Sequence, residues 1–245
     1  MFWDKVKCED RRWAAAINLA RRVSMETGVQ EISAATIEPP AEGARRQILD
    51  AAASCFLERG YSAASIDDVA RRLGSTKGRI YHHYPSKADL FADVFKTGMD
   101  MNYQAVLPEF TAANPPRDKL VRMARTHTRQ MIKTKAYQRA VWEGVEMHLR
   151  GSTTPEQREA LAELQAYRDR YSELFKSAIR ECKEAGVLDF DNLSIANQIM
   201  FISLNSPLFW YKPRPGEKEN DVSKIVDQVV TFALRGLGFQ GELPK

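Results

Sequence analysis

The sequence is poor in the residues that build disulfide frameworks and metal sites. Its three cysteines, Cys8, Cys55 and Cys182, lie far apart, and no histidine stands near them at the spacing of metal ligands. No run of about 18 apolar residues is present, although a membrane-spanning helix requires one, and the first residues lack the apolar core of a signal peptide. We therefore predict a protein of the reducing cytoplasm, with no metal site and no membrane contact.

Catalytic motifs are also missing. The sequence contains no Gly-x-Ser-x-Gly elbow, no phosphate-binding glycine loop before a helix, no His-Glu-x-x-His and no dinucleotide fingerprint. His127 and His148 fall on separate predicted helices, where a core or surface histidine is the commoner interpretation than an acid-base group. We expect no catalytic residue, no cofactor and no enzymatic activity; an all-helical enzyme is a remote rival.

An excess of charge of one sign is lacking over the chain as a whole. Lysine and arginine number 36 against 32 aspartate and glutamate residues, which leaves a net charge of +4. Any affinity for nucleic acid must therefore come from a local concentration of cations. The hydrophobic share of 44% is ample for a core, in one large domain or two modest ones.

The first 43 residues form a separate segment. Apolar residues at helical spacing over 1–24 predict a short amphipathic helix, and residues 25–43, with Pro39, Pro40 and Gly43, read as a linker. Such an extension is either an additional DNA-binding arm or dimer clasp, or a loosely ordered leader preceding a start at Met25.

Residues 65–91 hold the informative pattern of the chain. A helix over 45–59, followed by Gly60 as a left-handed cap, leads into a second helix that Ser65 and Asp68 begin as a capping box. Gly74 ends that helix, and a third short helix over about 77–84 follows before Pro85 stops it. Two helices joined by such a turn form a helix-turn-helix, whose second helix enters the major groove of DNA.

The second helix of this pair has the chemistry of a DNA reader, with cations and hydroxyls and no acidic residue over 75–87. Thr76, Lys77 and Arg79 at its start are candidates for base contacts, and later side chains for phosphate contacts. His82 and His83 diverge on a helix and cannot share a metal. The predicted DNA-binding residues are Arg45, Arg46, Ser65, Thr76, Lys77, Gly78, Arg79, Tyr81, His82, Tyr84 and Lys87.

This stretch resembles the DNA-binding domain of the tetracycline-repressor-type (TetR) family of bacterial regulators. Ser75 departs from the family pattern, which has an aliphatic residue after the turn glycine, and Cys55 replaces a usual leucine. The matching positions are Ile48-Leu49, Ala51-Ala52, Phe56, Gly60-Tyr61, Ser65-Ile66, Val69-Ala70, Gly74, Thr76, Gly78, Ile80-Tyr81, His83-Tyr84, Lys87 and Leu90.

The remainder of the chain is predicted to be helical, without the alternation of a strand. Helices are expected over 87–107, closed by Pro108, and over 156–184, 195–209 and 222–237. The last two are so apolar that they suit a homodimer, as the resemblance also implies; alternatively they complete the core of one subunit. The predicted interface residues are Tyr171, Ile195, Ile199, Ile202, Trp210, Tyr211, Ile225, Val229 and Phe232.

A second resemblance is short. Asn205 followed by Trp210-Tyr211-Lys212-Pro213 is similar to an element of TetR-type regulators that sense acyl-coenzyme A thioesters, although such aromatic residues are more often interface anchors. Methionine and aromatic positions, ordinary core by default, could also line an apolar cavity. The candidate ligand-binding residues are Met101, His127, Met131, Trp142, Tyr167, Tyr171 and Asn205.

Together these patterns predict an all-α protein. We expect an N-terminal extension (1–43), a three-helix helix-turn-helix DNA-binding domain (44–92) and a helical effector-binding and dimerisation domain (93–245). The resemblance implies a homodimeric bacterial regulator, most simply a repressor, that binds a near-palindromic operator in double-stranded DNA on the nucleoid. A small effector, an acyl-CoA or another fatty or steroid-derived ligand, would release it. The alternative is a helix-turn-helix module for protein interaction without effector control.

Overall fold

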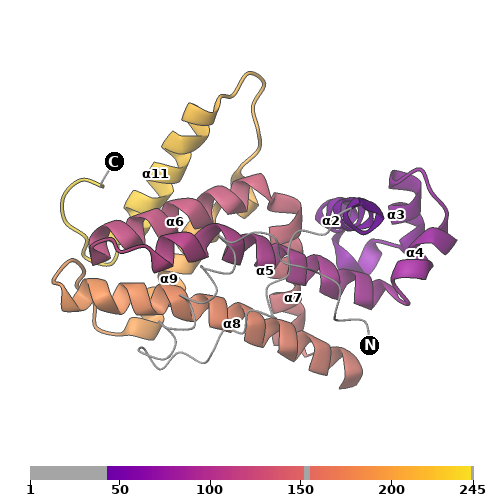
Figure 1. Cartoon of the computed structure of the whole chain (residues 1–245), viewed down its shortest axis with the longest axis horizontal. Helices are drawn as coiled ribbons and strands as arrows, with labels where there is room; N and C mark the ends of the chain where they lie inside the picture. The colour runs from indigo at the N-terminus through magenta and orange to yellow at the C-terminus, as the bar shows by residue number, and fades with distance from the viewer. Residues whose placement is uncertain (1–42, 152–154, 244–245) are drawn as a thin grey trace.

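The computed structural model describes residues 43–151 and 155–243, and every regular element within these ranges is a helix, which confirms the all-α prediction (Figure 1). The expected helix over 1–24 and nearly all of the linker over 25–43 lie outside the described residues. The helices are α2 (Gly43–Ala63), α3 (Ile66–Arg72), α4 (Lys77–His83), α5 (Lys87–Thr111), α6 (Pro116–Lys133), α7 (Lys135–Arg150), α8 (Pro155–Glu184), α9 (Leu193–Asn205), α10 (Pro207–Trp210) and α11 (Glu219–Arg235).

The side chains of the described residues pack into two apolar cores. The smaller core joins α2, α3 and α4 to the start of α5, through residues such as Phe56, Ile80 and Leu90, and also takes in residues of α7. The larger core lies between α5, α6, α8, α9 and α11 and contains Tyr103 and Phe175. Helix α5 runs through both cores, so the helix-turn-helix end is continuous with the larger bundle (Figure 1).

Helix α2 continues past its predicted end. Gly60 has the expected positive φ of 74°, but three further residues turn helically beyond this kink, up to Ala63. The backbone amide of Tyr61 donates to Glu143 Oε1 of α7 at 2.7 Å. A tertiary hydrogen bond thus satisfies an amide that the kink takes away from the helix.

Helix α3 begins with the predicted capping box. Ser65 Oγ accepts from the Asp68 amide at 3.2 Å, and Asp68 Oδ2 accepts from the Ser65 amide at 3.0 Å. The Ser65 hydroxyl, which donates to Asp68 Oδ2 at 2.7 Å, and the Ser65 amide together lower the pKa of the Asp68 carboxyl below its usual value. Helix α4 follows with Thr76 at its N-cap, although the Thr76 side chain makes no capping hydrogen bond.

Two predicted boundaries around prolines were wrong. Pro108 does not close α5, which runs on to Thr111 because Leu107 and Phe110 still belong to its buried face. The segment predicted as a helix over 195–209 is two helices, α9 and α10, since Pro207 has no amide with which to continue α9.

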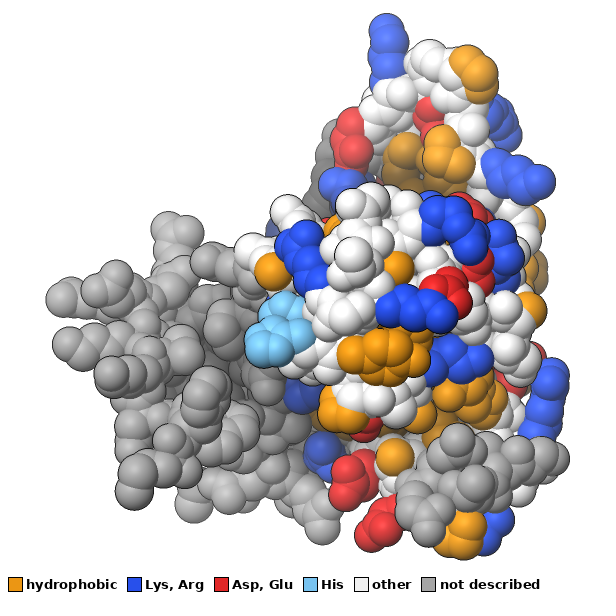
Figure 2. Space-filling model, turned by 90° about the vertical axis from the view of Figure 1, so that its right-hand side faces the viewer, with side chains coloured by type: hydrophobic (Ala, Val, Ile, Leu, Met, Phe, Trp, Pro, Cys, Tyr) orange, Lys and Arg blue, Asp and Glu red, His pale blue; other side chains and the backbone are white. Residues whose placement is uncertain are grey.

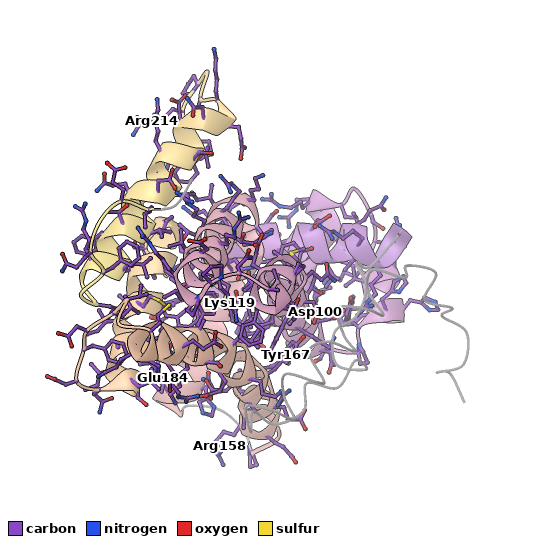
Figure 3. All side chains as sticks on the ribbon, turned by 60° about the vertical axis from the view of Figure 1, so that its left-hand side comes forward. Asp100, Lys119, Arg158, Tyr167, Glu184 and Arg214 are labelled. Carbon is purple, nitrogen blue, oxygen red and sulfur yellow. The ribbon has the colours of Figure 1, made fainter. Side chains whose placement is uncertain are left out.

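Helix α11 packs on α6 and α9, and ion pairs of Glu219 with Arg129 and Lys133 tie its first turn to α6. The loop that carries Arg214 projects beyond that end of the helix (Figures 1 and 3). Cys55 and Cys182 are buried free thiols. No helix among the described residues combines the length and the apolar character needed to cross a membrane.

Candidate DNA-binding surface and interior cavity

Helix α4 is held by one buried residue and exposes the others. Ile80 is completely buried in the smaller core, whereas Lys77, Gly78, Arg79 and Tyr81 are exposed. Figure 2 shows this end of the molecule, where lysine and arginine side chains are spread over the surface with histidine beside them. The predicted readers of DNA are therefore presented together on one rigidly supported helix.

The two cations of α4 have only exposed neighbours. Lys77 Nζ lies 2.6 Å from Asp67 Oδ2, and the Arg79 guanidinium donates to Gln47 Oε1 at 3.3 Å. Solvent-exposed pairs of this kind contribute little to stability. Both side chains can therefore exchange their partner for a DNA phosphate or base at small cost.

Gly78 leaves room on the exposed side of α4. Its backbone does not require glycine, and a Cβ placed on it would lie 3.8 Å from Thr76 Oγ1, which is an ordinary van der Waals contact. Nothing within the described subunit needs a glycine at this position. A partner molecule that approaches the backbone of α4 closely would require a glycine at this position.

Tyr84 requires a correction, because it is not available to a phosphate group. Its ring is buried, and its hydroxyl donates to Asp93 Oδ2 at 2.5 Å. Arg45 binds the same carboxylate, at 2.8 Å from Oδ1. Burial and the Asp93 carboxylate raise the pKa of the Tyr84 phenol. Tyr84 and Arg45 thus fasten α4 and α2 to α5.

Lys87 has structural partners within the subunit, and its contact with a phosphate stays a prediction. Its ammonium group donates to the carbonyl oxygens of Tyr61 at 2.9 Å and Ala64 at 3.0 Å, and lies 4.4 Å from the centre of the Tyr61 ring. These carbonyls end α2, where a cation is favourable. Arg46 pairs with Asp50 on its own helix, and the Ser65 hydroxyl serves the α3 cap.

A small cavity of about 50 Å³ lies inside the larger bundle, between α5, α6, α7, α8 and α9. Of the predicted ligand residues, His127, Met131, Trp142, Tyr171 and Asn205 line it, and Met101 and Tyr167 do not. The remaining lining residues are Met99, Asn102, Gln138, Val141, Val145, Arg168, Ser172, Phe201 and Leu208.

His127 joins three helices at this cavity. Its Nδ1 lies 2.9 Å from the Tyr171 hydroxyl of α8, and its Nε2 lies 2.9 Å from Asn205 Oδ1 of α9. Burial lowers the pKa of His127 to about 4, with a smaller contribution from the Arg168 cation. The ring is therefore neutral, with Nε2–H donating to Asn205 and Nδ1 accepting from Tyr171.

Asn102 and Gln138 are cavity residues that the sequence analysis missed. Asn102 Nδ2 donates to Gln138 Oε1 at 2.9 Å, and Gln138 Nε2 donates to the Gly98 carbonyl at 3.1 Å. The position of Asn102 could have been predicted, because it lies at helical spacing from Met99 and Val106 on the buried face of α5.

Tyr167 and Met101 take other positions. The Tyr167 hydroxyl donates to Asp100 Oδ1 of α5 at 2.5 Å, and the two side chains lie between α5 and α8 (Figure 3). Burial, followed by the Asp100 carboxylate, raises the pKa of Tyr167. Met101 packs against the smaller core. These two residues therefore contribute to packing between helices and not to the cavity wall.

The predicted interface residues mostly share one exposed surface. Ile195, Ile199, Ile202, Trp210 and Phe232 are each more than half exposed, and we call them the apolar face. Ile202, Trp210 and Phe232 of this face, together with Ile225 and Val229, line a groove of about 590 Å³. Tyr171 and Tyr211 require a correction, since both are buried within the subunit and cannot meet a partner.

Comparison with known protein families identifies the chain. Residues 48–94 match the model described as bacterial regulatory proteins, tetR family. Residues 113–237, more than half of the chain, match the tetracyclin repressor-like C-terminal domain. The chain belongs to the TetR family of regulators.

Curated relatives match part of the chain. The transcriptional regulator AcrR of Shigella flexneri is 34% identical over 74 residues, which cover 28% of this chain and 34% of AcrR. The repressor KstR2 of Rhodococcus jostii is 35% identical over 68 residues, 25% of this chain and 33% of KstR2. The matched region thus spans about a third of these relatives.

Solved structures share the whole fold. PfmR, a TetR family regulator from Thermus thermophilus, has a TM-score of 0.64 and 26% identity, over 78% of this chain and 98% of PfmR. KstR2 of Mycobacterium tuberculosis has a TM-score of 0.68 and 17% identity, over 84% of this chain and 100% of KstR2. AibR, solved with isovaleryl coenzyme A and operator DNA, has a TM-score of 0.62 and 23% identity, over 78% of this chain and 97% of AibR. The last two likenesses concern the fold alone.

Proposed function

We propose that this protein is a homodimeric transcriptional repressor, and not an enzyme, that acts in the bacterial cytoplasm on operator DNA. The observation that carries the proposal is α4, which exposes Lys77, Gly78 and Arg79 while Ile80 anchors it. Such a helix fits the major groove, with its first residues at the base edges.

A dimer is supported by the apolar face. Exposed isoleucine, tryptophan and phenylalanine side chains gather on α9, α10 and α11, next to the groove of about 590 Å³. A contiguous apolar surface of this kind typically marks a protein interface. A two-fold pair would set two copies of α4 about one DNA turn apart, roughly 34 to 36 Å, as a near-palindromic operator requires.

Effector control is supported by the position of the cavity. Sites for drug-sized ligands usually enclose about 300 Å³ or more, whereas this cavity measures about 50 Å³. In this proposal an effector moves the surrounding helices apart as it enters. Because α5 and α7 line the cavity and also pack in the smaller core, this movement would displace α4 and favour the state released from DNA.

For the effector we propose an acyl-CoA or another fatty or steroid-derived ligand. The support is the apolar lining of the cavity and the names of two proteins of the same fold, AibR with isovaleryl coenzyme A and the ketosteroid regulator KstR2. Shifts of the melting temperature with a panel of thioesters and with unrelated aromatic drugs test this choice. An absence of any thioester response would remove the acyl-CoA candidate.

The test of DNA binding is a mobility-shift titration with the DNA upstream of the gene. We expect Arg79→Ala to weaken specific binding by about 1–3 kcal/mol, since the guanidinium can bind a guanine edge. Arg150→Ala removes an exposed arginine at the C-terminal end of α7, outside α4, and is the matched control, expected to leave binding unchanged.

The alternative is a helix-turn-helix that binds a protein. The absence of acidic residues over 75–87 favours DNA instead. Binding to DNA that weakens steeply with rising salt supports the regulator. No binding at low salt, with no difference between the wild type and Arg79→Ala, would favour the alternative.

A further inference from the structure

The polar atoms of the cavity wall are nearly all satisfied within the subunit. His127 uses both ring nitrogens, on Tyr171 and Asn205. Ser172 Oγ accepts from Asn197 Nδ2 at 2.8 Å, and the Gln138 amide is bonded at both of its ends. These hydrogen bonds fix the shape of the cavity wall and leave few free donors or acceptors for an incoming molecule.

Asn102 is the exception among the described lining residues. It is only 3% exposed, and its Nδ2 is held by Gln138, which fixes the orientation of the amide. Its Oδ1 is fully buried and has no hydrogen-bond partner in the structure. This oxygen is an acceptor, so only a donor can satisfy it.

The charge at the cavity is of one sign. Arg168 of α8 is the charged residue in the lining, and its side chain is 22% exposed. Its NH1 is 3.2 Å from Asp169 Oδ1, but that carboxylate is 57% exposed and lies outside the cavity lining. Because His127 is neutral, Arg168 is the charge that the described lining residues present to an occupant, which favours anions and disfavours cations.

We infer that the molecule that fills this cavity donates a hydrogen bond to Asn102 Oδ1 and places a negative charge near Arg168, which defines it as a hydroxylated apolar acid. The inference rests on the proposed effector role of the cavity and, of the ligands proposed there, selects a fatty or steroid-derived free acid over an acyl-CoA thioester. Met99, Met131, Val141, Trp142 and Phe201 would cover the apolar body. An acid without the hydroxyl would bury the Asn102 oxygen unpaired, at a loss of about tenfold or more in affinity.

Two matched pairs of probes test this: decanoate with 10-hydroxydecanoate, and phenylacetate with 4-hydroxyphenylacetate, measured by calorimetry on the full chain. In at least one pair we expect the hydroxy acid to bind about tenfold more tightly than its parent. The methyl ester of that hydroxy acid should bind more weakly than the acid. Equal affinities within both pairs, or no binding by any acid, would overturn the inference.

Variants locate the two groups. Asn102→Leu should bring the affinity ratio within the pair close to one, and a ratio is insensitive to a general loss of stability. Arg168→Met should remove the advantage of the acid over its methyl ester, whereas Arg180→Met, an exposed arginine on the same helix, should keep it. Persistence of both preferences in both cavity variants would overturn the assignment.

A mobility shift in the same buffers separates this inference from the proposed function. If the parent acids release the protein from its operator as well as the hydroxy acids do, the proposed regulator function is supported and the preference for a hydroxyl group is contradicted. If it never binds DNA, the proposed function falls, and the calorimetric ratio still decides what the cavity accepts.

Discussion

His127 is a residue whose charge state is tied to the fold. It is 2% exposed, and its ring packs edge-on against Phe175 and Phe201 while its nitrogens bind Tyr171 and Asn205. Protonation would leave a cation in this apolar surrounding with no carboxylate among its hydrogen-bond partners. The ring of His127 can therefore hold α6, α8 and α9 together only while it is neutral.

The pH dependence of stability follows from this burial. The pKa of His127 falls from 6.5 to about 4 on folding, so the unfolded chain takes up the proton first as the pH falls. Its stabilising effect is complete above pH 6.5 and is lost between about pH 6.5 and 4, by about 3 kcal/mol in all. Urea unfolding across this range should show a shallower pH slope for His127→Gln than for the wild type.

The control for this experiment is His82→Gln, which removes an exposed histidine of α4. It should follow the wild-type curve. A His127→Gln curve parallel to that of the wild type from pH 7 to about 4.5 would show that His127 does not govern the acid sensitivity.

Gly78 separates DNA contact from stability. Alanine fits its site and favours a helix by roughly 1 kcal/mol over glycine. We expect Gly78→Ala to melt at the same temperature or higher, and yet to bind operator DNA more weakly, because the methyl group lies where the DNA backbone would approach. Gly236→Ala is the matched control, since it also has room for a methyl group and lies at the end of α11. Unchanged DNA affinity in Gly78→Ala would place the DNA farther from α4.

At the scale of the elements, α7 faces both cores. Its Val141, Trp142 and Val145 line the cavity. On the other side the Tyr137 hydroxyl donates to Asp50 Oδ1 of α2 at 2.6 Å, and Glu143 accepts the Tyr61 amide at the α2 kink. A movement of α7 in response to an occupant would therefore reach α2 directly.

The Glu143 contact can be tested by hydrogen exchange. Glu143→Ala removes a charged acceptor from the Tyr61 amide, and such bonds are worth about 1.5–3 kcal/mol. We expect that amide to exchange faster, with the rest of α2 little changed. Glu146→Ala, whose partner Arg150 lies on the same helix, should leave the Tyr61 amide protected. Equal protection in both variants would mean that α7 does not hold the kink.

The sequence was informative wherever the deciding partners are close along the chain. The Ser65 capping box and the positive φ of Gly60 depend on residues within a few positions, and both were predicted. The carbonyl contacts of Lys87 could not be predicted in this way, because the carbonyls it binds lie 23 to 26 residues earlier. Asn102 was missed for a similar reason, since Gln138 is 36 residues away.

At the scale of the whole molecule, one subunit presents one α4, whereas a near-palindromic operator offers two half-sites. The apolar face on α9, α10 and α11 is the surface that could join two subunits. Its three isoleucines lie on α9 and explain why the sequence of that helix is apolar nearly all round. Burying it would remove large side chains from water, at roughly 25 cal/mol per Å². A variant that does not dimerise is therefore expected to lose tight binding to operator DNA as well.

The variant Ile199→Glu tests this link, because a pair of carboxylates would face each other across a two-fold interface. Ile199 is 53% exposed, so the subunit should keep its fold and its far-ultraviolet spectrum. Light scattering should show a monomer, and operator affinity should fall about 100-fold or more as the second half-site is lost. Leu149→Glu, which alters a 78% exposed leucine on α7 outside the apolar face, should remain a dimer with wild-type affinity. If Ile199→Glu stays dimeric, the two subunits meet through another surface.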